Sequence, residues 1–245
     1  METHFTDARI LIAGLGLIGG SVAKALKDAG CHNIEGLDAD AEVLSAARSD
    51  GVILGEFRAD GSRYDCVICS LPPRLVVPLY QQIKSSLRPG GVFAEMSGLK
   101  SAVARDLTGS LAKEHELLCL HPMAGSEKSG YAHSDAALFR GAPLLLTPTS
   151  RTGDSALALA EFLRKEIYQQ DKIHYHSRLT TVLPDIPHEN SFVDAVLNPN
   201  HPLTVVVHDE RRRHGDDVAG GADHGPALER LHEGREGALG RLTGD

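Results

Sequence analysis

Short apolar runs alternate with amphipathic helical patterns along most of the chain. The runs that predict strands span residues 8–16, 32–38, 64–73, 90–97, 116–123 and 142–149. The helical patterns between and after them span residues 22–29, 43–47, 75–87, 103–111 and 155–167. Strands that are apolar throughout are typical of a parallel sheet that helices cover on both faces. The pattern therefore predicts an α/β fold with a doubly wound, mostly parallel sheet.

A glycine-rich turn joins the first predicted strand to the first predicted helix. It consists of Gly14, Leu15, Gly16, Leu17, Ile18 and Gly19. In a GxGxxG turn at this place, the first glycine permits a tight bend and the second lets the backbone approach a pyrophosphate. The third lets helix and strand pack closely, with the phosphates at the helix N-terminus. The motif predicts a Rossmann-type domain with these six residues at a dinucleotide cofactor.

Asp38 ends the second predicted strand, about 20 residues beyond the turn. A carboxylate there accepts hydrogen bonds from the adenosine ribose and repels a 2′-phosphate, so NAD is favoured over NADP. The alternative is that Asp38 is a turn residue or caps the following helix. Ser70, Leu71 and Pro72 end the third predicted strand, where proline cannot continue the ladder. We expect these three residues to line the cofactor.

His121 lies near the end of the apolar run at residues 116–123, and Ser126 follows in the next turn. Ligands bind outside the carboxyl ends of strands in an open parallel sheet, so His121 is placed to meet a substrate. Imidazole suits a general base, whereas a structural histidine bonded to the turn is the alternative. The Ser126 hydroxyl is a candidate for substrate or cofactor contact, and a simple turn residue is its alternative role.

Composition limits the classes of partner. The chain has 245 residues, 42% of them hydrophobic, and a formal net charge of -8. This charge argues against nucleic acid and anionic membranes, since both require a basic face, but it permits a small-molecule substrate. The chain shows neither a membrane-spanning run nor a signal peptide, so we expect a cytoplasmic protein. The four cysteines lack metal-site spacing, so we expect no metal and reduced, buried thiols.

The sequence changes character near residue 170. Every lysine lies at or before Lys172, whereas most of the 13 histidines follow it. We therefore predict a dinucleotide-binding domain over residues 1–170 and an atypical segment over residues 171–245. The final residues are rich in Gly, Asp, Arg and His, a composition that favours disorder. A shift of the reading frame near residue 170 is the alternative hypothesis.

Five segments together carry a family resemblance. GLGLIGGS with Asp38, SLPP, EMSGLKS, HPMAGSEKSGY and LFRGAPLLLTPT occur in the order and spacing of prephenate and arogenate dehydrogenases of tyrosine biosynthesis. The chain resembles this family over about residues 8–176. The resemblance implies an NAD-dependent oxidoreductase that converts prephenate to 4-hydroxyphenylpyruvate by oxidative decarboxylation. It also implies that His121 is catalytic and hydrogen-bonds the C4 hydroxyl while hydride leaves C4.

The chain departs from the family pattern in two places. Many members have a serine where this chain has Gly98, and Ser97 stands one place earlier, so Ser97 is the candidate for the catalytic hydroxyl. The resemblance further implies a helical C-terminal domain that completes the substrate pocket, supplies a substrate arginine and forms a homodimer. Residues 171–245 show no long amphipathic helices. An arogenate dehydrogenase and an NAD-binding module without catalysis are therefore the alternative interpretations.

Overall fold

The computed structural model describes residues 5–171 except 60, 62 and 99, together with residues 174–176 and 206–208. For residues 101, 174–176 and 206–208 it describes the backbone only. All of these residues belong to the first of two compact units, which spans Met1–His208. The predicted atypical segment at 171–245 lies outside the described residues except for Asp171 and the two short strands.

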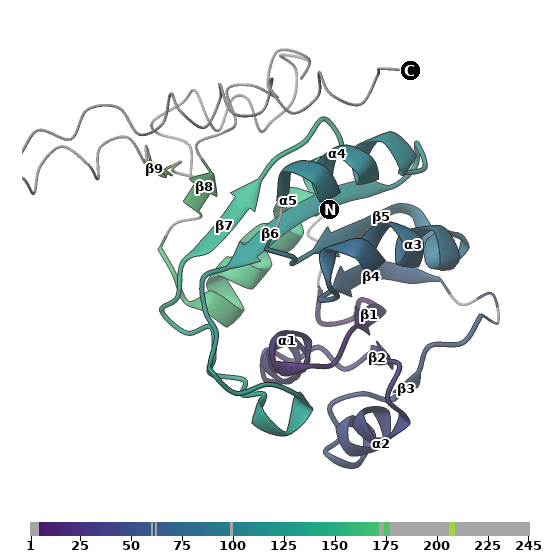
Figure 1. The fold of residues 1–245 in the computed structure, drawn as a ribbon, viewed down its shortest axis with the longest axis vertical. Coiled ribbons are helices and arrows are strands. Elements are labelled where there is room, and N and C mark those ends of the chain that lie inside the picture. Colours follow the sequence, from purple (N-terminus) through teal and green to yellow (C-terminus); the bar gives the residue numbers. More distant parts are fainter. Residues whose placement is uncertain are drawn as a thin grey trace, which may run out of the picture. The chain divides into compact units, whose positions relative to one another are not determined.

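The described residues form a sheet with the strand order β3-β2-β1-β4-β5-β6-β7-β8-β9 (Figure 1). The first six strands are β1 (Ile10–Ala13), β2 (Ile34–Leu37), β3 (Gly55–Glu56), β4 (Tyr64–Cys69), β5 (Leu87–Glu95) and β6 (Glu116–Pro122). They are parallel to one another. The others are β7 (Leu144–Thr147), β8 (His174–His176) and β9 (Val206–His208). This arrangement confirms the predicted Rossmann-type, mostly parallel sheet.

Strand β7 runs antiparallel to β6, and β8 and β9 then run parallel to β7. Parallel neighbours need a crossover, usually through a helix of several turns. Residues 123–143 contain only the short 3-10 helix η2 (Tyr131–His133), so the chain folds back beside β6 in the opposite direction. The loop between β6 and β7 therefore lies at the carboxyl ends of the parallel strands.

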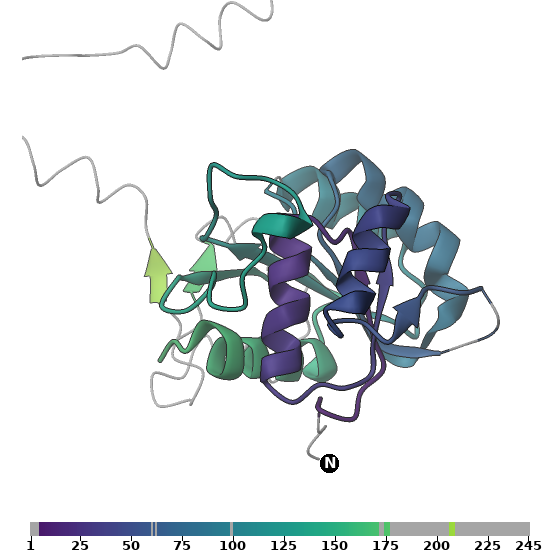
Figure 2. The ribbon, with the colours of Figure 1, turned by 90° about the horizontal axis from the view of Figure 1, so that it is seen from below.

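Helices cover both faces of the sheet (Figures 1 and 2). The α-helices are α1 (Leu17–Asp28), α2 (Ala41–Ser49), α3 (Pro73–Ile83), α4 (Lys100–Ser110) and α5 (Asp154–Phe162). In β1, Ile10 and Ile12 pack with the side of α1, α2 and α5, whereas Leu11 and Ala13 pack with the side of α3 and α4. This alternation buries every residue of β1, which explains its uninterrupted apolar run.

Helix ends differ slightly from the predicted ranges. The helix expected over residues 75–87 ends at Ile83 and continues as the 3-10 helix η1 (Lys84–Ser86). Leu87 already belongs to β5, where it pairs with Tyr64 and is buried. The helix expected over residues 155–167 is α5 followed by the π-helical turn η3 (Leu163–Tyr168). Pairing in the sheet thus overrides a continuous helical pattern at Leu87.

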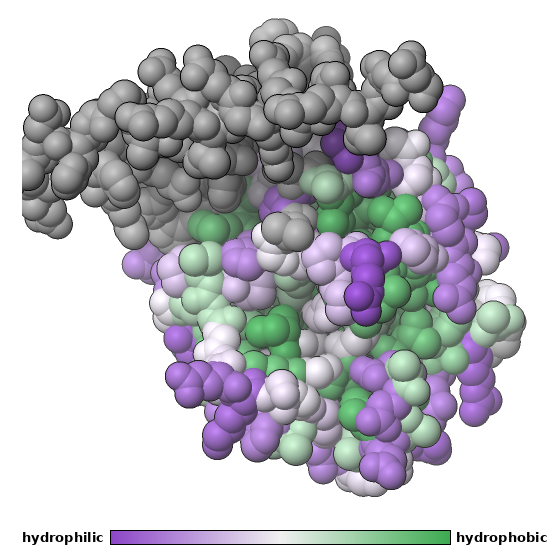
Figure 3. Space-filling view, viewed as in Figure 1, coloured by the Kyte–Doolittle hydropathy of each residue, from purple (hydrophilic) through white to green (hydrophobic). Residues whose placement is uncertain are grey.

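The surface drawn in Figure 3 shows hydrophilic residues around the margin of the described region, with hydrophobic ones between them. Three large apolar side chains of the described residues are exposed, namely Leu54, Leu75 and Met123. Within the described ranges, no helix combines the length and the apolar character that crossing a lipid bilayer requires.

Candidate functional site

The glycine turn has the geometry that its spacing predicts. Gly14 has φ +85°, and a Cβ there would lie 2.8 Å from Leu71 Cδ2. A Cβ on Gly19 would lie 1.8 Å from the carbonyl oxygen of Gly14, which no real side chain permits. A Cβ on Gly16, by contrast, would meet nothing within 4 Å. Gly14 and Gly19 are therefore required by the fold, whereas Gly16 faces open space where a ligand can approach the backbone.

The N-terminus of α1 opens directly onto this space. Gly16 is its N-cap and supplies no side-chain hydrogen bond, and the first turn carries no acidic residue. The first N–H groups of a helix lack intrahelical partners and carry partial positive charge. The turn therefore presents donors to an anion, and this is what the phosphates of a dinucleotide require.

Asp38 lies immediately after β2, beside the glycine turn. Its Oδ2 accepts a hydrogen bond from the Leu15 N–H at 2.7 Å, and its Oδ1 accepts one from the Asp40 N–H at 3.0 Å. Asp40 is the N-cap of α2, where its side chain accepts from the Glu42 N–H. Asp40, and not Asp38, is therefore the residue that caps α2. The Asp38 carboxylate is held at the turn, and each of its oxygens retains a further lone pair for a ribose hydroxyl.

The end of β4 packs against the same turn. The Ser70 N–H donates to the carbonyl of Ala13 at 2.8 Å, and Leu71 lies against Gly14. Pro72 is the N-cap of α3. The structure therefore brings the predicted residues of the turn, Asp38 and the 70–72 segment together, along β2, β1 and β4. These are adjacent strands in the sheet order (Figure 1).

A buried ion pair occupies the end of β5, and the sequence reasoning did not identify it. Lys100 Nζ lies 2.6 Å from Glu95 Oε1, and the side chains are 11% and 0% exposed. Glu95 Oε2 accepts from the Ser97 hydroxyl at 2.6 Å and from the Ser97 N–H at 2.9 Å. Burial lowers the pKa of Lys100, and the Glu95 carboxylate opposes that shift. A lone carboxylate at the end of an apolar strand, five residues before a lysine, is the sequence signal that could have revealed it.

Two thiols flank this ion pair across the sheet. Strand register places Cys69 of β4 and Cys119 of β6 on either side of Glu95. Burial raises the pKa of Cys69 to about 12 and that of Cys119 well above its usual range. All four cysteines are free and buried, which confirms the expected reduced thiols. The thiols are therefore protonated at neutral pH, and Glu95 and Lys100 are the charged members of this cluster.

His121 lies two residues beyond Cys119 on β6, opposite Leu145 of β7. It is half-buried, and a Cβ on Gly98 would lie 3.6 Å from its Cε1 atom. The loop after β5 therefore borders the His121 ring. In this loop Gly98 is the residue against the ring, whereas the Ser97 hydroxyl is directed to Glu95.

Ser126 lies on the loop that follows β6. Its side chain is exposed, and its hydroxyl accepts from the Lys128 N–H at 3.2 Å, as in a turn. The structure thus places the three predicted catalytic residues differently. His121 lies near the end of β6, Ser97 lies in the loop after β5, and Ser126 lies on the exposed loop after β6.

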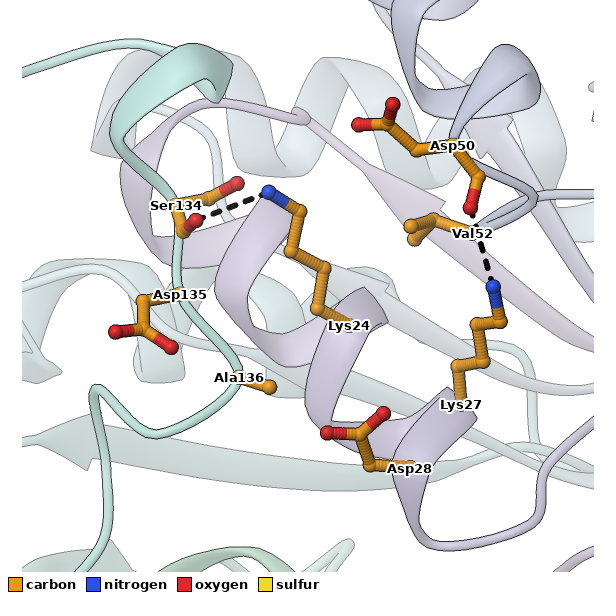
Figure 4. Close-up of a pocket in the computed structure, with 8 residues that line it drawn as sticks. All are labelled: Lys24, Lys27, Asp28, Asp50, Val52, Ser134, Asp135 and Ala136. Carbon is orange, nitrogen blue, oxygen red and sulfur yellow. Dashed lines mark hydrogen bonds between the residues drawn. The ribbon is translucent and has the colours of Figure 1, made fainter.

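The far end of this loop is anchored on α1 (Figure 4). Lys24 donates to the carbonyl of Ser134 at 2.9 Å and lies over the Tyr131 ring, 4.6 Å from its centroid. The Tyr131 hydroxyl donates to Asp50 at 3.0 Å, and Gly20 leaves no room for a side chain beneath Ser134. A pocket of about 360 Å³ lies here, against the second half of α1 and so away from the glycine turn. Helix α1, which begins at the glycine turn, therefore also anchors the loop that follows β6.

Comparisons with known proteins identify the family. The family model described as prephenate dehydrogenase, nucleotide-binding domain, matches residues 22–169. The chain is 32% identical over 189 residues to a prephenate dehydrogenase of Bacillus subtilis, covering 73% of this chain and 50% of that protein. It is 27% identical over 187 residues to a cyclohexadienyl dehydrogenase of Zymomonas mobilis, covering 73% of this chain and 63% of that protein.

A solved structure gives the same result. The crystal structure of prephenate dehydrogenase from Aquifex aeolicus in complex with hydroxyphenyl propionate and NAD+ matches with a TM-score of 0.61 and 29% identity. The match covers 67% of this chain and 59% of that one. The chain thus spans half to just under two thirds of the length of these relatives. Since the family model covers most of the described residues, the chain belongs to the prephenate dehydrogenase family through its nucleotide-binding domain.

Proposed function

We propose that this chain is the nucleotide-binding part of an NAD-dependent oxidoreductase that converts prephenate to 4-hydroxyphenylpyruvate with loss of CO2. One observation carries the proposal. The open glycine turn, Asp38 and His121 all lie at the carboxyl ends of the parallel strands, where ligands bind in such sheets. The relatives named prephenate dehydrogenase, one of them in complex with NAD+, support this assignment.

The residues present fit a dinucleotide. The space at Gly16 and the uncapped N-terminus of α1 suit the pyrophosphate. Asp38 would accept hydrogen bonds from the adenosine ribose and repel a 2′-phosphate, so the preferred cofactor is NAD. Ser70, Leu71 and Pro72 would line the path from β1 toward β5. The cofactor would therefore extend from β2 across β1 and β4, with its nicotinamide end toward β5 and β6.

His121 is the proposed general base. NAD, when bound, accepts hydride from C4 of the substrate. His121 would take the proton of the C4 hydroxyl, which increases the electron density that expels the hydride. Loss of the ring carboxylate as CO2 would then leave its bonding electron pair in the ring, which becomes aromatic, and His121 would return the proton to the C4 oxygen; aromatisation makes the step irreversible. Ser97 would help to order the loop beside His121, because its hydroxyl donates to Glu95 at the end of β5. Ser126 would contact the substrate from the exposed loop after β6.

The substrate side of the proposal rests on the family. The chain spans 50% of the Bacillus relative, and the predicted helical domain with its arginine and homodimer contacts falls outside the described residues. Arogenate is the alternative substrate. Nucleotide binding without turnover is the outcome expected if the chain lacks the residues that hold the substrate.

NADH formation by the intact chain tests the proposal. The reaction contains NAD with either prephenate or arogenate, and His121→Asn is measured beside the wild type. We expect turnover with prephenate that falls on the order of 100-fold or more in the variant, while NAD affinity stays unchanged. Equal rates for the two proteins would contradict the role of His121. Turnover of arogenate alone would assign the alternative substrate.

A further inference from the structure

The Glu95–Lys100 ion pair is an unusual feature for the centre of a sheet. The desolvation cost of two buried charges can exceed the attraction between them, so a gain in stability alone does not explain this pair. The thiols on either side are protonated and offer no alternative counter-charge. The Glu95 carboxylate and the Lys100 ammonium therefore each compensate the charge of the other. Perturbed ionisable groups of this kind concentrate at functional sites.

The ion pair closes the loop that leaves β5. Glu95 is the last residue of the strand, and Lys100 is the first residue of α4. Lys100 Nζ contacts the Glu95 carboxylate at 2.6 Å and its carbonyl oxygen at 3.4 Å. The Ser97 N–H and hydroxyl both donate to the same carboxylate. Both ends of the loop and its second residue are thus tied to one buried side chain.

This loop separates the two halves of the proposed site. On one side, the Met96 N–H donates to the carbonyl of Cys69 at 2.9 Å, and the Ser70 hydroxyl lies 3.8 Å from the Met96 sulfur. On the other side, Gly98 borders the His121 ring. A shift of the loop would therefore change the surface that lies between the cofactor path at Ser70 and the proposed base.

We propose that the Glu95–Lys100 pair is a positioning clamp that holds residues 96–98 between Ser70 and His121, and so fixes the nicotinamide end of the cofactor against the base. The proposal rests on the function proposed above, because it assumes that NAD lies along this edge. Glu95 and Lys100 are positioning residues, since they act through the loop. The adenosine half of the cofactor would lie at Asp38 and the glycine turn, which follow β2 and β1 beyond β4, and its binding would not depend on Glu95 and Lys100.

The test separates the two halves of the cofactor. ADP probes the adenosine half, and NADH adds the nicotinamide half. The variant is Glu95→Gln/Lys100→Met in the intact chain, which removes both charges and leaves no unpaired one. Its matched control is Glu114→Gln/Lys113→Met, because these two residues are exposed and the net charge again stays constant. Affinities are measured by calorimetry for ADP and by nucleotide fluorescence for NADH, and thermal unfolding is recorded for each protein.

We expect the clamp variant to bind ADP like the wild type and to bind NADH about tenfold more weakly or worse. In a protein that turns over prephenate, kcat would fall on the order of 100-fold, because a small misplacement of reacting groups is costly. The control should match the wild type in every measurement.

Two results would overturn the clamp. One is unchanged NADH affinity in the clamp variant. The other is an equal loss for ADP and NADH, which would indicate a general structural role. A wild type that binds neither nucleotide contradicts the proposed function itself. A wild type that binds NADH without turnover contradicts only its catalytic part, and the comparison of ADP with NADH still decides the clamp.

Discussion

The glycine turn and the His121 side lie at the same edge of the sheet but use different chemical groups. At the turn, the binding groups are backbone N–H donors at the N-terminus of α1, and they are reachable because Gly16 has no side chain, whereas Gly14 and Gly19 permit the close packing of the turn. On the His121 side, the candidate groups are side chains. The loop beside them is held by the buried ion pair of Glu95, at the end of β5, and Lys100, at the start of α4. A site made of backbone is recognisable from residue spacing, whereas a site made of side chains depends on which strands become neighbours.

The largest effect is expected at Gly19. Its substitution by Ala would place a Cβ 1.8 Å from the Gly14 carbonyl oxygen, so the turn or the helix must shift. We expect the free energy of unfolding to fall by about 3 kcal/mol or more, measured by denaturant titration. Gly109→Ala is the control, because that helical glycine faces open space. A Gly19→Ala protein as stable as the control would refute the close packing of turn and helix.

Removal of one charge on the His121 side should also be costly. Lys100→Met leaves the Glu95 carboxylate buried without its partner. We expect a loss of about 3 kcal/mol in the free energy of unfolding, because an uncompensated buried charge is strongly unfavourable. The double variant Glu95→Gln/Lys100→Met should recover most of that loss. If the single and double variants are equally stable, the two charges do not form the coupled pair described here.

Gly16 offers a sharper contrast with Gly19. A Cβ at Gly16 meets nothing within 4 Å, so Gly16→Ala should change the free energy of unfolding by less than about 0.5 kcal/mol. The added methyl group would occupy the space proposed for the pyrophosphate. We expect NADH affinity to fall about tenfold, measured by fluorescence titration. Undiminished affinity in this variant would contradict the placement of the phosphates at the turn.

The smallest effect concerns the other end of β6. His115, just before the strand, is 4% exposed, and its Nδ1 lies 2.9 Å from the Tyr80 hydroxyl. Burial lowers the pKa of His115 below its usual value of 6.5. The unfolded chain then holds the proton more tightly than the folded chain. Its contribution to stability is therefore complete above pH 6.5 and declines as the pH falls below that value.

His115→Gln should accordingly flatten the pH dependence of the unfolding midpoint on the acid side, without affecting NADH affinity. His32→Gln is the control, since His32 is exposed. An unaltered acid limb in the His115 variant would show that this histidine does not cause the decline. The contrast with His121→Asn, which should affect turnover, separates the structural histidine just before β6 from the proposed base on β6.

Much of the fold and one half of the site could be predicted from the sequence. The apolar runs predicted the parallel strands, and the GxGxxG spacing with Asp38 predicted the residues that meet around α1. The antiparallel direction of β7 could not be predicted from its apolar run, because it follows from the short return after His121. The Glu95 cluster escaped prediction because it depends on register, which places Cys69, Glu95 and Cys119 side by side from distant segments.

The most direct test of the account is competitive binding of NADH and NADPH to the intact chain, with Asp38→Asn measured in parallel. The carboxylate held at the glycine turn should make NADH bind at least about tenfold more tightly than NADPH. Asp38→Asn should narrow that ratio, because its neutral side chain no longer repels a 2′-phosphate. Equal affinity for the two nucleotides in the wild type, or binding of neither, would contradict the assignment of this edge of the sheet as an NAD site.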